Sequence, residues 1–191
     1  AEGFRSWDEE SEAEDGGSPG GYDVIAAEYL LRKGVPIAAV GRMQRESVEA
    51  ATWVVRFFTA QQKEEIFVEV DPRTRRATGF HRYLDEAAPG PRLTRPAAEA
   101  IATREFARYG LDRAAFEVRE AHVFQQPSRV DWLFHFQERK PLGAEAYRRV
   151  SIRVAGDQVT QFAKTVKIPE HEFREATRQT LLRTLLVIGK I

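Results

Sequence analysis

The four histidines are the side chains of this sequence that most readily supply chemistry, either as metal ligands or as proton carriers near neutral pH. They are His81, His122, His135 and His171, and none stands in a metal-binding spacing such as H-E-x-x-H. His122 and His135 fall in segments that alternate like strands, so they could be cross-strand neighbours that share a metal ion. No third ligand is evident in the sequence. The favoured interpretation is therefore two histidines on the polar face or rim of a sheet.

Other reaction chemistry has little support. The chain has no cysteine, which excludes thiol catalysis, disulfides and cysteine-ligated zinc or iron–sulfur centres. No serine stands in a G-x-S-x-G elbow, and no phosphate-binding glycine motif is present. Glu64 and Glu65 begin a predicted strand, so their side chains point to opposite faces and do not act together. The sequence predicts no catalytic residue, no cofactor and no metal site.

One group of basic residues suggests binding. Arg119, Arg149 and Arg153 alternate with apolar residues in predicted strands, on the same polar face as His135. Such a strip is able to hold an anion or an acidic partner. A solvated sheet face without a ligand is the commoner explanation for the same pattern, and both interpretations stay open.

Charge along the chain is uneven although the totals balance. The 191 residues contain 29 basic and 29 acidic side chains, which argues against a dedicated nucleic-acid binder. Residues 1–21 hold seven acids and one arginine, and they end in a glycine-rich run. We expect this segment to be an acidic flexible linker, the alternative being an acidic arm that docks on the basic remainder or on a partner.

The rest of the chain shows helical and strand patterns in turn. Helices are predicted over residues 23–33 and 94–109, which end at Gly34 and Gly110. Between and after them the apolar residues recur with a period of two, with polar residues at the alternate positions. This alternation predicts an antiparallel sheet that has one apolar and one wet face, with helices on a single face. The fold class is α+β.

The order of these elements repeats along the chain. Residues 22–92 and residues 93–168 each read as a helix followed by four extended segments, which predicts two tandem units that each lay a helix across an antiparallel sheet. In the first unit, residues 37–47 form the first extended segment. Trp53 and Trp132 occupy equivalent places, where we expect both to pack in the core. Chance similarity of two unrelated α+β segments is the alternative.

Residues 169–191 are predicted to form a C-terminal helix that starts at Pro169. Residues 181–188 are unusually apolar for a surface helix, yet they are too few to span a bilayer, which needs about 18 or more apolar residues. They either pack on the sheet or form the approach to a membrane segment.

Five segments resemble a known family. These are WVVRFF (53–58), QKEE (62–65), RVDWLFHF (129–136), RRVSIRVAGD (148–157) and VKIPE (166–170). They are similar to the region that precedes the membrane-embedded part of some bacterial CPBP-family, CAAX-protease-like intramembrane metalloproteases. Each half also resembles a PepSY or cystatin-like unit. The resemblance covers about residues 22–175 and consists of strand patterns, since the family's catalytic glutamate pair with its arginine and its histidine motifs have no counterpart here.

The resemblance implies an extracytoplasmic domain, with a membrane tether beyond Ile191 and no peptidase site of its own. The expected function is then a binding or regulatory domain that recognises a peptide or protein segment, with the membrane portion of the same polypeptide as one candidate. The alternatives are a stand-alone small-ligand-binding or enzymatic cone-shaped α+β domain, and a simple spacer. An enzyme would need a buried polar group with a displaced pKa in a pocket.

Overall fold

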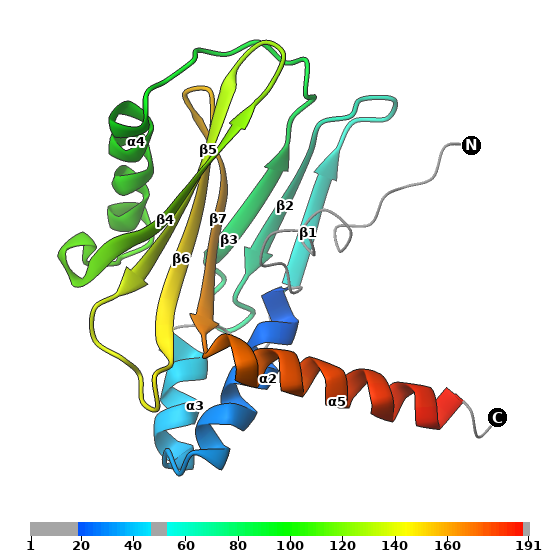
Figure 1. The fold of residues 1–191 in the computed structure, drawn as a ribbon. Helices are drawn as coiled ribbons and strands as arrows, with labels where there is room; N and C mark the ends of the chain where they lie inside the picture. The colour runs from blue at the N-terminus through cyan, green and yellow to red at the C-terminus, as the bar shows by residue number, and fades with distance from the viewer. Residues whose placement is uncertain (1–18, 47–52, 189–191) are drawn as a thin grey trace.

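The fold is that of a computed structural model, which describes residues 19–46 and 53–188. It is an α+β fold, as the sequence predicts, in which helices pack on and beside an antiparallel sheet (Figure 1). The helical elements are α2 (Pro19–Arg32), α3 (Ile37–Glu46), α4 (Arg95–Arg108), the short 3-10 helix η1 (Arg113–Ala115) and α5 (Glu170–Ile188). The strands are β1 (Trp53–Phe58), β2 (Glu65–Val70), β3 (Ala77–Tyr83), β4 (Phe116–Gln125), β5 (Val130–Glu138), β6 (Tyr147–Ala155) and β7 (Gln158–Lys167).

The seven strands form one sheet in the order β1-β2-β3-β7-β6-β5-β4, with every neighbouring pair antiparallel. Strands β1 to β3 form one meander and β4 to β7 form another. The two meanders join where Phe80 and His81 of β3 lie opposite Phe162 and Gln161 of β7. Strands β1 and β4 are therefore the two edges of the sheet.

The helices do not divide between the halves as the predicted tandem units require. Helix α4 lies over β5, β6 and β7. Helix α2 packs against β7 of the second half, next to α3, near one end of the sheet (Figure 1). Each half thus shares its sheet with the other, and the first helix does not lie across the first meander.

Three local predictions are wrong. Residues 37–47 were expected to be extended, but residues 37–46 form α3, whose buried Val40 and Met43 lie three positions apart and pack on α2. Trp53 is 67% exposed, because α2 packs on β7 and leaves β1 uncovered. Helix α2 begins at Pro19, within the expected linker, since proline suits the first turn of a helix. Residues 1–18 of that linker lie outside the described residues.

The larger of two apolar clusters lies between α4 and the second meander. Ala98 and Ala102 are fully buried, and their small side chains let α4 approach the sheet closely. Phe106 of α4 meets Phe136 of β5 edge to face, with ring centroids 5.0 Å apart. Trp132 is partly buried against the same cluster, and its indole N–H donates to the Leu93 carbonyl over 3.0 Å. Its predicted place in the core is thus partly confirmed.

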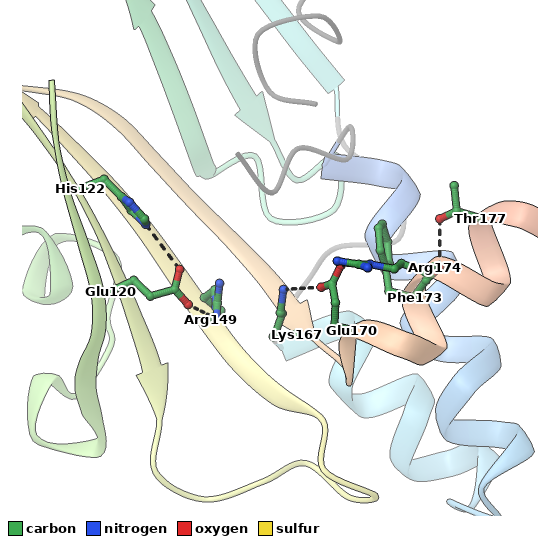
Figure 2. Close-up of polar contacts among 8 residues, drawn as sticks. All are labelled: Glu120, His122, Arg149, Lys167, Glu170, Phe173, Arg174 and Thr177. Atoms are coloured by element: carbon green, nitrogen blue, oxygen red, sulfur yellow. Dashed lines mark hydrogen bonds and ion pairs between the residues drawn. The ribbon is translucent and has the colours of Figure 1, made fainter. Parts of the chain in front are cut away.

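The smaller cluster packs α2 and α3 against the end of the sheet. Ala26 and Leu30 of α2 pack there with Val40 of α3 and with Val166 near the end of β7. Helix α5 then starts directly after β7, as predicted. Glu170 in its first turn accepts from Lys167 at 3.3 Å and from Arg174 at 3.0 Å (Figure 2). These contacts fix the start of α5 on the end of the sheet.

Glu172 connects α5 to the residue that directly follows α2 through an ion pair with Lys33, 2.8 Å from Nζ to Oε1. Beyond its first turns α5 extends away from the sheet (Figure 1). Within the described part of the chain, no helix has the length and apolar character needed to cross a membrane. The prediction that residues 181–188 pack or approach a membrane concerns side chains outside the described ones.

A buried arginine holds the segment that connects the two halves. Arg129 is 4% exposed and binds Asp131 through Nε to Oδ1 at 2.8 Å and Nη2 to Oδ2 at 3.2 Å. Its Nη1 also donates to the carbonyl oxygens of Asp85 at 2.7 Å and Ala88 at 2.9 Å. The guanidinium thereby connects the loop after β3 to the β4–β5 hairpin.

We expect Arg129→Met to lower the free energy of unfolding by about 3–5 kcal/mol, because it leaves the buried Asp131 carboxylate without its counter-charge. Arg92→Met is the matched control, since Arg92 is exposed and also donates to a carbonyl of this region, that of Pro127, over 2.9 Å. Urea denaturation of both variants measures the difference. Equal losses in the two variants would contradict a special role for the buried pair.

Candidate functional site

The sheet face opposite α4 carries a polar row that crosses both halves. Register pairing places one residue of every strand in this row. From edge to edge they are Arg56, Phe67, His81, Gln161, Arg153, Leu133 and His122. The next positions on β6, β5 and β4 are Ser151, His135 and Glu120, which lie opposite one another. Charged and imidazole side chains are therefore concentrated on β4, β5 and β6.

An ion pair spans β5 on this face, near the β4 edge of the sheet. Nη2 of Arg149 on β6 donates to Oε1 of Glu120 on β4 over 3.0 Å (Figure 2). Because β5 lies between β6 and β4, the two side chains meet across β5. Burial alone would raise the pKa of Glu120, but the Arg149 charge, with His135 and His122 nearby, holds that pKa below its usual value.

His135 lies beside this ion pair and is only 6% exposed. Its Nδ1 is 2.8 Å from the Ser151 hydroxyl oxygen. The His122 ring stands nearly edge-on to it, with centroids 5.7 Å apart, and His122 Nε2 is 3.5 Å from Glu120 Oε2. One donor atom each from Glu120, His122 and His135 lie within 4.8 Å of one another. The two histidines, which the sequence offers as possible neighbours, lie diagonally across β4 and β5, and the Glu120 carboxylate lies close to both.

The structure brings only part of the predicted basic strip together. Arg149 and His135 are both buried on this face, where Arg149 binds Glu120 and His135 contacts Ser151. Arg153 lies with its guanidinium carbon 4.6 Å from the centre of the Phe124 ring. Arg119 stands at a β-bulge in β4, exposed, and pairs with Glu117 at 3.0 Å instead of joining the strip. Anion binding by these four residues stays a prediction.

The expectation of a wet face is wrong for part of β5 and β6. Ser151, His135 and Arg149 are all buried, although their alternation with apolar residues resembles that of a solvated strand face. The physical reason is that the long side chains of Arg149 on β6 and Glu120 on β4 reach toward each other and cover β5. Alternation reports which residues share a face, and it does not report what covers that face.

Glu120 is the functional candidate that sequence reasoning missed. The signal available was the Glu-x-His spacing at Glu120 and His122, which puts both side chains on one face of a strand. The missing information was the register that sets Glu120 opposite His135. A bulge between Val118 and Glu120 shifts that register, so counting residues along β4 does not give it.

A second feature is the edge strand β1, whose six residues are all exposed. Trp53, Val55 and Phe57 point to the α4 side of the sheet, and Val54 and Phe58 point to the opposite side. Five of its six side chains are thus apolar and in contact with solvent. The sixth residue, Arg56, binds Glu65 of β2 through its Nε over 2.9 Å.

Comparison of the chain with family models, with curated proteins and with solved structures found no match in any of the three. The relationship to CPBP-family proteases and to PepSY or cystatin-like units therefore stays a prediction from the sequence.

His81, in the polar row, is held neutral by its surroundings. It stacks on Tyr83 with ring centroids 4.1 Å apart and an interplanar angle of 18°. Burial, and secondarily the positive charge of Arg153, lower its pKa from 6.5 to about 4. In the unfolded chain the imidazole takes up a proton near pH 6.5, so between that pH and pH 4 the unfolded state binds more protons than the folded one.

We therefore expect the free energy of unfolding to fall as the pH drops from 6.5 to 4, with His81 contributing about 3 kcal/mol of the loss. His81→Phe retains an aromatic ring beside Tyr83 and is expected to remove this contribution. His171→Gln, at an exposed site on α5, is the control. Urea denaturation at several pH values gives the profiles, and a profile of His81→Phe parallel to that of the wild type would refute the assignment.

Proposed function

We propose that this chain is a binding module without catalytic activity that takes up an extended peptide or protein segment along β1. The observation that supports this most is the apolar, exposed character of β1 at an open sheet edge. An edge strand presents unpaired backbone N–H and C=O groups, which another strand is able to complete. Side chains of the incoming segment would then contact the exposed apolar residues on either side.

The shape of the apolar surface favours a strand over a helix as the ligand. A helix laid on one sheet face would cover Trp53 and Phe57 but leave Val54 and Phe58 in water. A strand added beside β1 alternates its side chains between the two faces and so covers both sets. The ligand we propose is an extended segment with apolar residues on both faces.

The two sheet edges differ in a way that supports this assignment. Natural edge strands are commonly protected from pairing by charged residues, proline or bulges. Strand β4 has such protection, because Glu117, Arg119 and Glu120 are charged and a bulge interrupts the pairing. Strand β1 has no proline, and its one charged residue is engaged by β2. An edge strand without such protection is expected where its function is to pair with a strand of another chain.

We further propose, from the resemblance alone, that the module belongs to an intramembrane metalloprotease of the CPBP type and lies on the extracytoplasmic side of the membrane. Each meander follows a helical segment along the chain, which is the order that suggests two PepSY or cystatin-like halves, although α2 packs on β7 and not on the first meander. The segment bound at β1 would be a substrate stretch or part of the same polypeptide. We propose no nucleic-acid partner.

The alternative, a small-ligand-binding or enzymatic domain, has one observation in its favour. His135 is buried close to a carboxylate, that of Glu120, which is one part of the arrangement that such a domain needs.

To test the β1 site, we would select peptides of eight residues from a display library against the wild-type chain. Val54→Lys together with Phe58→Lys places two charges on one side of the edge and is expected to weaken the selected peptides at least about tenfold, with unchanged thermal stability. Val123→Lys is the matched control, since Val123 is 48% exposed on the other edge strand. Calorimetry measures the affinities.

Hydrogen exchange of the wild type with a selected peptide should show added protection at β1 and none at β4. Equal affinity of the peptides for the double variant, or failure to select any peptide, would overturn the proposal. Concentration-dependent dimerisation through β1, seen by analytical ultracentrifugation, would instead assign the edge to a second copy of the chain.

The proposed link to a protease predicts what the coding sequence holds after Ile191. We expect several apolar spans of about 20 residues, with paired glutamates and histidines within them. Sequencing the locus tests this directly. A stop codon after Ile191 would remove the link without affecting the β1 site.

A further inference from the structure

We propose that Glu120, His122 and His135 form a binding site for a divalent transition-metal ion of the zinc type. Two imidazoles and one carboxylate are a donor set that such ions bind in proteins. The site lies on β4 and β5, at the edge of the sheet opposite β1. It is therefore independent of the proposed peptide site.

The sheet places the three donors on one face. Glu120 and His122 are two residues apart on β4, so both project to the same side. His135 on β5 lies directly opposite Glu120. Their donor atoms lie within 4.8 Å of one another, whereas a tetrahedral zinc ion with bonds near 2.0–2.1 Å needs donors roughly 3.3 Å apart. His122 Nε2 and Glu120 Oε2, at 3.5 Å, are already at this separation.

Partners behind the donors orient them. The contact of 2.8 Å between His135 Nδ1 and the Ser151 hydroxyl oxygen fixes the orientation of the imidazole ring. Arg149 holds Oε1 of Glu120, so that Oε2 faces the His122 nitrogen (Figure 2). Metal-binding histidines and carboxylates are commonly fixed by such outer hydrogen bonds.

Accessibility differs among the three ligands in a useful way. The His122 and Glu120 side chains are 42% and 43% exposed, whereas His135 is buried. An ion therefore has a route from solvent and a fixed ligand beneath it. Three protein ligands leave at least one coordination position open for water or for a group from a bound molecule. The positive charge of Arg149 opposes the ion, so this site is expected to bind more weakly than a closed structural zinc site.

The test titrates Zn²⁺ into the full chain at pH 7.5 and measures binding by isothermal titration calorimetry. One Zn²⁺ is expected to bind per chain. His122→Ala removes an exposed ligand with little effect on folding, and we expect it to weaken Zn²⁺ binding at least about tenfold. His171→Ala is the matched control, because His171 is 80% exposed and lies next to Glu172, yet outside the cluster.

Co²⁺ titration supplies a second measurement, since visible absorption bands report its coordination by the chain. Bands in the wild type and in His171→Ala, but not in His122→Ala, would support the site. Absence of Zn²⁺ binding at 100 µM ion, or binding by His122→Ala as tight as that of the wild type, would overturn it. The second result would place the ion on other acidic residues of the chain. Neither result bears on peptide binding at β1.

Discussion

The pairing of β3 with β7 is the constraint on which the rest of this structure depends. It joins two meanders into one sheet through Phe80 and His81 opposite Phe162 and Gln161. Because these two strands are interior, β1 and β4 become the edges. The same pairing carries one apolar face and one polar face across both halves. It therefore determines which strands remain at the open edges of the sheet.

Burial of charge on the polar face imposes a second constraint. Arg149 is 5% exposed, and an unpaired charge at that depth would cost several kcal/mol. Glu120 supplies the counter-charge from two strands away, and the pair shields His135 between them. The pair thus places a carboxylate beside two imidazoles. Electrostatic compensation of a buried arginine and assembly of a candidate metal site have the same physical origin here.

The two edges of the sheet have different properties although they belong to one surface. The β4 edge carries charges, a bulge and the histidine cluster. The β1 edge carries exposed apolar residues on both faces, because α2 packs on β7 instead of covering the first meander. Arg129 fixes the connection between the halves and thereby their shared sheet. Each edge is suited to a different kind of ligand.

Local patterns in the sequence are enough to predict the α+β class, helices α2, α4 and α5, and most strands. Period-two alternation also places His122 and His135 on neighbouring polar faces. The inferred repeat gives the wrong answer for residues 37–46, which form α3, and for Trp53, which is exposed. Both errors come from treating the first half as a copy of the second, in which Trp132 is partly buried.

The sequence by itself determines the alternation of polar and apolar residues, the helix ends at glycine, and the absence of thiol chemistry. Only the tertiary structure decides that α2 packs on β7, that Glu120 faces His135, and that β1 remains exposed. The reason is that side-chain direction along a strand follows from the backbone, whereas register, bulges and strand order depend on contacts between residues far apart in the chain.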